Sequence, residues 1–269
     1  MSTAEELFRA GDLKGCLAEL QSEVRKRPAD PKLRIFLAQL LMVTGDWDRA
    51  VNQLGVSAEL DAAALPMKHT YTAAIQCEKL RAAVFAGQRS PLVLGDPPPW
   101  IALLLQALAS SAQGRATEAA DLRARAMEDA EASPGTLNDT AFDWLADADS
   151  RLGPVLEVLL NGAYYWVPVS RIRRIEFEKP EDIRDLVWLP AQFTWTNDGQ
   201  AMGLVPVRYP GSELAAEDAL RLSRKTQWSE LGDGAFAGLG QRVLTTSAEE
   251  LGLLEIRTID IPSQPAPDG

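Results

Sequence analysis

The chain of 269 residues has a single histidine, His69, and only two cysteines, Cys16 and Cys77. Classical zinc sites take three or four ligands from these residue types, so three such residues this far apart argue against a zinc site. A Ser-His-Asp or Cys-His catalytic system would have to use His69, which lies in a helical-looking segment where a packed or surface histidine is the usual case. The cysteines lack CxxC spacing, and we expect free buried thiols.

The chain also lacks an excess of positive charge and a long apolar run. Its 27 basic and 38 acidic side chains give a formal net charge of -11 and a pI near 4.7, whereas phosphate binding needs a clustered basic surface. The most apolar stretch, Trp100 to Ala109, is about half the length that spans a bilayer. The first residues show no signal-peptide pattern. We therefore expect no nucleic-acid role, no membrane insertion and a cytoplasmic location.

Phosphate-binding loops and catalytic carboxylate pairs are lacking as well. The segment Gly232 to Gly240 is rich in glycine, but it has neither the lysine of GxxxxGK[ST] nor a βαβ context. We expect it to be a loop between strands. Carboxylate pairs could serve a glycosidase, but among 38 acidic residues chance pairs are expected and carry no weight. We therefore expect no cofactor and no enzymatic activity.

The first ~130 residues contain a pattern of paired helices. Gly11-Asp12-Leu13 and Gly45-Asp46-Trp47 are the same turn, and positions 11 and 45 are 34 apart, the period of a tetratricopeptide repeat. A later unit, Gly114 to Ala119, lies about three periods on. A small residue and a leucine recur at matching positions of the first two units: Cys16 and Ala50, Leu20 and Leu54. The alternative is a generic helical bundle with accidental spacing.

The pattern changes after residue 133. Ser133-Pro134-Gly135 breaks the helical spacing, and Leu137 to Ala148 then reads as one further helix. Aromatic and β-branched residues beyond it favour strands, and Asn197-Asp-Gly199 favours a hairpin turn. Ser247 to Glu250 is a capping-box pattern that predicts a short helix.

These patterns predict an α+β protein with segregated parts. The predicted order is a tetratricopeptide-like helical domain (1–133), a connecting helix (134–152), a small, mostly antiparallel α+β domain (153–262) and a disordered tail (263–269).

Three aspartates, Asp139, Asp143 and Asp147, repeat every four residues and would line one face of the predicted connecting helix. Like charges at this spacing cost a few tenths of a kcal/mol per pair. They form a solvated face, pair internally with Arg151 and its neighbours, or form an acidic ridge. A ridge would receive a basic partner segment or the arginines of the second domain.

An aromatic strip and an arginine cluster follow. Strand alternation places Tyr164 and Trp166 on one face of a strand and Tyr165 on the other. The two aromatic side chains on one face belong either to the hydrophobic core or to a binding site. Ile172 and Ile175 are three apart, which suggests a helical turn that exposes the arginines between and beside them. These arginines could bind carboxylates bidentately or pair with Asp147 and Asp149. The candidate partner-binding residues are Trp100, Asp139, Asp143, Trp144, Tyr164, Tyr165, Trp166, Arg171, Arg173 and Arg174.

Several segments of the second half together resemble one known family. They are Phe142–Pro154, Asn161–Pro168, Arg171–Phe177, Asp185–Trp188 and Arg208–Glu213. The chain resembles the ImpE/SciE family, also called TagJ proteins, accessory components of bacterial type VI secretion. The likeness covers nearly the whole chain but is specific mainly from residue 142 to 213, and residues 214–237 look divergent.

The resemblance implies a non-enzymatic cytoplasmic adaptor with a repeat-like helical N-terminal domain. It implies binding to the N-terminal helix of the small contractile-sheath subunit. It also implies an effect on sheath assembly or recycling through an indirect link to the sheath-disassembly ATPase. Apolar grooves recognise amphipathic helices in this way, and repeat arrays offer concave surfaces. The alternatives are a generic tetratricopeptide-like scaffold with another cytoplasmic partner, and an enzyme with a deep cleft in the second domain.

Overall fold

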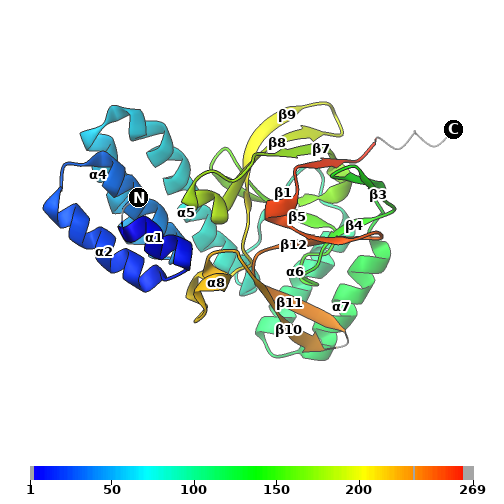
Figure 1. Cartoon of the computed structure of the whole chain (residues 1–269). Coiled ribbons are helices and arrows are strands. Elements are labelled where there is room, and N and C mark those ends of the chain that lie inside the picture. The colour runs from blue at the N-terminus through cyan, green and yellow to red at the C-terminus, as the bar shows by residue number, and fades with distance from the viewer. Residues whose placement is uncertain (1–2, 233, 263–269) are drawn as a thin grey trace.

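The computed structural model describes residues 3–232 and 234–262, so the predicted tail 263–269 lies outside the described residues. Helices occupy one end of the molecule and a twisted sheet the other, with two further helices beside the sheet (Figure 1). The helices of the first half are α1 (Thr3–Ala10), α2 (Leu13–Lys26), α3 (Pro31–Val43), α4 (Trp47–Leu60), α5 (Leu65–Phe85), α6 (Pro99–Ala112) and α7 (Ala116–Asp129).

Three helical hairpins, α1–α2, α3–α4 and α6–α7, turn at the predicted glycines. Gly11, Gly45 and Gly114 have φ of 83°, 73° and 75°, a region that glycine enters without steric cost. The small residues at the matching positions, Cys16 and Ala50, are fully buried where the paired helices meet. The predicted helical character of the first half is therefore confirmed.

A nine-stranded sheet, counted over the described residues, has the order β1-β6-β5-β9-β8-β7-β14-β2-β3. Its neighbours pair antiparallel, except that β1 runs parallel to β6. In chain order these strands are β1 (Leu92–Val93), β2 (Gly135–Leu137), β3 (Thr140–Phe142), β5 (Val155–Leu160), β6 (Ala163–Pro168), β7 (Ile172–Phe177), β8 (Trp188–Trp195), β9 (Gln200–Pro206) and β14 (Thr258–Asp260). The α+β class is confirmed.

Smaller elements complete the fold. A three-stranded sheet joins β4 (Leu145–Asp147), β12 (Val243–Thr246) and β13 (Glu250–Gly252), and a hairpin joins β10 (Thr226–Gly232) and β11 (Ala235–Gly240). The segment predicted to be a glycine-rich loop is thus largely strand β11. The short helical elements are α8 (Asp218–Arg221), η1 (Ala62–Ala64), η2 (Val169–Arg171), η3 (Ile183–Leu186), η4 (Ser212–Leu214) and η5 (Leu253–Glu255).

The sheet has a core on each face. Strand β5 is buried along its whole length, and its alternate residues serve different cores. Val155 and Leu159 join the helices in one core, together with residues of α6. Leu156 and Val158 join Leu244 of β12 in the other.

The predicted connecting helix over 134–152 is wrong, because this segment forms β2, β3 and β4. Asn138 and Asp139 have φ of 44° and 72° and form a two-residue hairpin turn in which Leu137 pairs with Thr140. Positive φ at both turn residues is the hairpin geometry that asparagine and aspartate accept. The aspartates that repeat every four residues therefore share no helical face.

Two shorter helical predictions are also wrong. Residues 172–177 form β7, and the spacing of three between Ile172 and Ile175 arises because the register shifts by one residue at Arg173, as in a β-bulge. The predicted helix at Ser247 is the turn between β12 and β13, where Thr246 Oγ1 accepts hydrogen bonds from the amides of Ala248 and Glu249.

Candidate partner-binding site

Four buried charged side chains, which we call the charged network, join the helices to the sheet. Arg81 of α5 donates through Nε and Nη2 to the two carboxylate oxygens of Glu157 in β5, at 2.7 and 2.8 Å. Arg242 donates to Glu157 and also to Asp147 of β4. The charges alternate in sign from α5 through β5 to β4, and all four residues are at most 4% exposed.

The network shifts its carboxyl groups in opposite directions. Burial alone would raise the pKa of Glu157, but the guanidinium groups of Arg81 and Arg242 lower it to about 2. Burial raises the pKa of Asp147 to about 6, and this effect outweighs the opposing attraction of Arg242. Tyr209 donates a hydrogen bond to Asp147 at 2.8 Å. Buried charges cost desolvation energy that only complete pairing offsets, so the network is a structural joint.

The predicted aromatic candidates belong mostly to this joint. Tyr164 donates through its hydroxyl to Glu157, and Trp166 Nε1 donates to the Tyr164 oxygen at 2.7 Å. Both rings are buried, at 1% and 0% exposure. Tyr165 packs on the opposite face of β6, so the predicted alternation is confirmed. Tyr164 and Trp166 are buried and hydrogen-bonded to each other, so they belong to the core and not to a docking surface.

Another buried arginine, outside the charged network, contacts the end of α3. Arg208 donates through Nη1 to the carbonyls of Val43 and Arg221, at 2.6 and 2.7 Å, and through Nη2 to the carbonyl of Met42 at 3.3 Å. Burial lowers the pKa of Arg208 to about 10. A cation at a helix C-terminus satisfies carbonyls that have no partner within the helix.

The predicted arginine cluster is exposed and paired locally. Arg173 pairs with Asp198, and Arg174 pairs with Asp260 at 2.6 Å and with Glu176 at 3.1 Å. Arg171 donates to the carbonyl of Asp96 at 3.3 Å. The expected pairing of the cluster with Asp147 and Asp149 is therefore wrong. Asp149 instead pairs with Arg151 at 2.5 Å.

The remaining candidates do not converge. Trp100 is buried in α6, whereas Trp144 is 41% exposed between β3 and β4. Asp139 lies in the β2–β3 turn, and the backbone amide of Asp143 donates to Ser247 Oγ at 2.8 Å. The ten predicted residues are thus divided among the core, the β2–β3 and β3–β4 connections, and the exposed arginine cluster.

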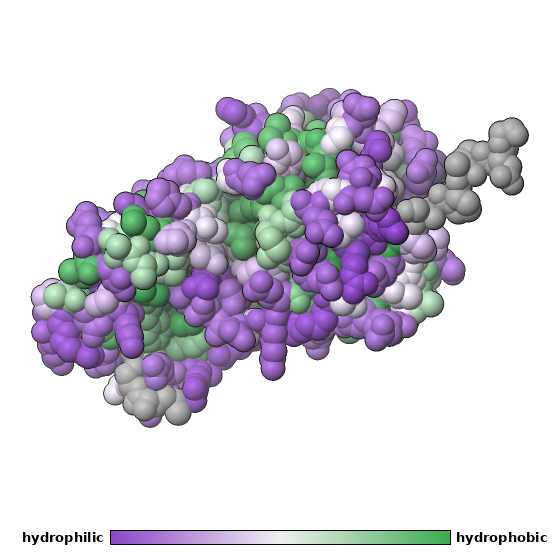
Figure 2. Space-filling model, turned by 90° about the horizontal axis from the view of Figure 1, so that it is seen from above, coloured by the Kyte–Doolittle hydropathy of each residue, from purple (hydrophilic) through white to green (hydrophobic). Residues whose placement is uncertain are grey.

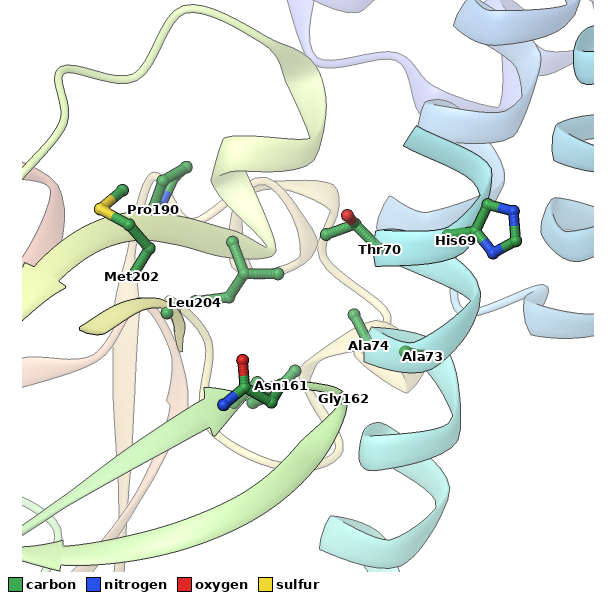
Figure 3. Close-up of a pocket in the computed structure, with 11 residues that line it drawn as sticks. His69, Thr70, Ala73, Ala74, Asn161, Gly162, Pro190, Met202 and Leu204 are labelled. Carbon is green, nitrogen blue, oxygen red and sulfur yellow. The ribbon is translucent and has the colours of Figure 1, made fainter. Parts of the chain in front are cut away.

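A cleft of about 500 Å³ opens between α5 and the sheet. We call it the α5 cleft, and the residues that line it are His69, Thr70, Ala73, Ala74, Leu159, Asn161, Gly162, Pro190, Met202, Gly203 and Leu204. Figure 3 shows Thr70 and Ala74 directed from α5 towards the strands, while the His69 ring lies on the far side of the helix. Met202 is 56% exposed. On the upper face of the molecule, apolar residues gather between the helices and the sheet (Figure 2).

The cleft lies beside the junction of β5 and β9, which share a short ladder. They pair only at Leu159 and Leu204, whereas β5 pairs with β6 and β9 pairs with β8 along their lengths. The β5–β6 hairpin turns at Asn161 and Gly162, with φ of 50° and 78°. Among the described residues, Leu159–Leu204 is the one pair that joins β9 to β5, and Met202 and Gly203 beside it line the cleft.

The sequence reasoning missed the α5 cleft. The Asn-Gly pair at 161–162 is a strong hairpin signal and would have placed this turn. The short ladder between β5 and β9 has no comparable signal in the local sequence. Within the described residues no cluster of three or more His, Cys, Asp or Glu side chains is arranged for a metal ion. None of the helices between residues 3 and 262 combines the length and apolarity needed to cross a membrane.

The chain is similar to known proteins in sequence and in fold. The family described as ImpE protein matches residues 139–260. The type VI secretion system accessory component TagJ of Pseudomonas aeruginosa is 51% identical over 257 residues, which cover 96% of this chain and 90% of the relative. An X-ray crystal structure of a Vibrio parahaemolyticus protein matches with a TM-score of 0.89 at 24% identity, covering 98% of both chains. At that identity the likeness shows the fold alone.

Proposed function

This chain belongs to the ImpE family, and from that premise we propose that it is an accessory component of a type VI secretion system. It acts in the cytoplasm as a non-enzymatic adaptor. Its partner is the N-terminal helix of the small contractile-sheath subunit, and binding modulates sheath assembly or recycling, with an indirect effect on the disassembly ATPase. The half-identical relative, which is named a type VI secretion system accessory component, supports the proposed accessory role.

The α5 cleft is the observation that carries the binding proposal. Apolar groups line it from both sides: Ala73 and Ala74 on α5, and Met202 and Leu204 on β9. Met202, which is 56% exposed, joins these residues in a contiguous apolar lining, and contiguous apolar surface is typical of interaction sites. An amphipathic helix would place its i, i+3, i+4 and i+7 anchors there. In this proposal α1–α5 act as a tetratricopeptide-like array that presents α5.

The test uses a labelled peptide of the first ~25 residues of the sheath subunit encoded beside this protein. We expect saturable binding by fluorescence anisotropy, lost when the apolar anchors of the peptide become alanine. Met202→Glu should weaken binding at least tenfold, because it places a charge against the apolar face of the helix.

The matched control is Met127→Glu, at a methionine of α7 that is 37% exposed but lies outside the α5 cleft. It should bind as the unmodified protein does. Absence of binding at high micromolar peptide would overturn the proposal. Equal loss in both variants would remove the cleft as the site while keeping the partner.

A further inference from the structure

The β10–β11 hairpin has one edge that the protein covers and one that it leaves open. On the covered edge, the amide of Phe236 donates to Ser150 Oγ at 3.0 Å, and the Phe236 carbonyl accepts from the Ser150 amide at 2.9 Å. The amide of Gly238 donates to Asp149 Oδ2 at 2.9 Å. On the other side, β10 pairs with β11 alone among the described strands. Figure 1 shows the hairpin at the bottom of the molecule, with β10 on the outside.

The alternation of hydrogen bonds shows which backbone groups of β10 face outwards. The amide of Gln241 donates to the carbonyl of Lys225 at 2.9 Å, so these two residues are a hydrogen-bonded pair. Such pairs alternate with unbonded pairs along two antiparallel strands, and the register is constant as far as Glu230. Thr226, Trp228 and Glu230 therefore direct their N–H and C=O groups away from β11. No described residue outside the hairpin bonds to these backbone groups.

β10 lacks most of the features that keep a strand edge from pairing. Natural edges are usually very short, interrupted by proline or protected by lysine. β10 spans seven residues, Thr226–Gly232, without proline or lysine, and a bulge interrupts only its end. The side chains from Gln227 to Glu230 are all exposed, and α7 approaches the hairpin at its turn, where it shares a cleft with Gly234 and Ala235. The open edge suits another polypeptide strand, because a backbone offers donors and acceptors at the same spacing.

The charges of this segment are complementary to those of a second, antiparallel copy. In a register centred on Trp228, Thr226 of one copy faces Glu230 of the other, so no like charges face each other. Arg224 then lies diagonal to Glu230 of the other copy, about 7–8 Å away, which long side chains can span. Both charged residues are exposed, and neither forms an ion pair with another described residue. Pairing between copies would balance both charges.

Aromatic rings would line one face of the joined strands. The Tyr209 ring packs over β11 at Gly238, where a larger side chain would collide with it. The centres of the Tyr209 and Trp228 rings are 5.6 Å apart, and Trp228 remains 37% exposed. In the register centred on Trp228, the same ring of the second copy lies beside it and covers that exposed surface. Aromatic cross-strand pairs stabilise antiparallel sheets.

We propose that β10 pairs with β10 of a second copy of this chain, antiparallel and centred on Trp228. The two hairpins then form one four-stranded sheet across a two-fold axis, in which each copy contributes the same surface. This surface shares no residue with the α5 cleft, and the proposal stands whether or not the sheath peptide binds there.

Cross-linking of the full-length protein tests the register. Gln227 of one copy should face Ser229 of the other with Cα atoms about 4.5 Å apart, which a disulfide can span. An equal mixture of Gln227→Cys and Ser229→Cys, oxidised with glutathione disulfide, should give a covalent dimer that neither variant forms alone. The unmodified protein, whose Cys16 and Cys77 are buried, is the control. Absence of this dimer, or an equal yield from either variant alone, would overturn the proposal.

Sedimentation velocity over a range of concentrations tests the surface. We expect a reversible dimer that Trp228→Lys weakens at least tenfold, because two lysines would then face each other. The matched control is Phe236→Lys, an aromatic residue that is 42% exposed in β11 and lies away from the open edge; it should dimerise as the unmodified protein does. Circular dichroism checks the folding of both variants.

A second variant makes the test independent of the Trp228 ring. Glu230→Lys changes an exposed side chain and should weaken the dimer about fivefold, because it places a positive charge near Arg224 of the second copy. A protein that stays monomeric up to ~0.5 mM would contradict the proposal. So would a dimer that is equally strong in the Trp228→Lys and Glu230→Lys variants, since it would use another surface.

Discussion

The charged network and the exposed arginine cluster are built from the same kinds of residue but lie in opposite surroundings. The side chains of Arg242, Glu157 and Asp147 are 0% exposed, whereas Arg173 and Arg174 are 47% and 42% exposed. Surface ion pairs contribute about 0–1 kcal/mol, while breaking a buried pair costs ~3–5 kcal/mol. Burial, rather than the number of ion pairs, therefore decides which arginines hold this molecule together.

The largest expected effect comes from breaking the network at its centre. Glu157→Ala leaves Arg81 and Arg242 buried without their shared carboxylate, so the free energy of unfolding should fall by ~3–5 kcal/mol in chemical denaturation. The matched control is Glu176→Ala in β7, where the side chain is 49% exposed; it should cost less than ~1 kcal/mol. Similar losses in both variants would erase the contrast between the two regions.

The pH dependence of stability tests the charge state of Asp147. Its folded-state pKa of about 6 lies above the ordinary value of 3.8, so its contribution is fully present below pH 3.8 and is lost as the pH rises through 6. Compared with Asp147→Asn, the unmodified protein should gain ~2 kcal/mol of stability between pH 7 and pH 4.5.

Glu157 stays charged in the folded protein across this range, because its pKa is lowered from 4.5 to about 2. The stability that Glu157 contributes is lost only as the pH falls from 4.5 towards 2. Glu157 therefore does not interfere with the measurement. Parallel pH profiles for the two proteins in thermal denaturation would show that Asp147 stays ionised down to pH 4.5, with its pKa unperturbed by burial.

A smaller loss is expected where an arginine meets the end of a helix. Arg208→Met removes the donors to Met42, Val43 and Arg221 but also relieves the burial of a charge, so we expect ~1.5 kcal/mol of destabilisation. The control is Arg224→Met. Arg224 donates to the carbonyls of Phe8 and Arg9 at the end of α1 from an exposed position and should matter less. An equal cost for both would contradict the dominance of burial.

The smallest effect is expected in the arginine cluster itself. Arg173→Ala removes an ion pair with Asp198 whose side chains are 47% and 74% exposed. The change in unfolding free energy should stay within ~0.5 kcal/mol. A loss above ~2 kcal/mol in urea denaturation would place this region in the same energetic class as the charged network.

Local patterns were the part of the fold that the sequence could predict. Gly11, Gly45 and Gly114 mark turns whose geometry depends on one residue, and the helices between them follow. The spacing of four between Asp139 and Asp143 predicted a helix that is not there, because the periodicity of charged residues cannot distinguish a helix from two short strands. Asn138 and Asp139 are the residues that favour a hairpin turn at this position. The bulge at Arg173 imitated a helical turn in the same way.

The candidate site was less predictable because its features are non-local. Tyr164 and Trp166 are aromatic in a strand, and only the approach of Arg81 and Glu157 shows that they serve the interior. The α5 cleft depends on how β5 and β9 lie against α5. No residue type in the sequence indicates that arrangement. The family resemblance identified the chain through Trp144 and its neighbours without locating a binding surface.

The charged network also sets an order for events during synthesis of the chain. Arg81 meets Glu157 across 76 positions, and Arg242 reaches back 85 positions to Glu157 and 95 to Asp147. A chain emerging from the ribosome can form its helical hairpins early, because their contacts are close in sequence. Arg81 then has no carboxylate partner until β5 has emerged. Glu157 and Asp147 cannot pair with Arg242 until residue 242 has been synthesised. The charged network is thus completed last, by a residue that lies far along the chain from the helices it helps to hold.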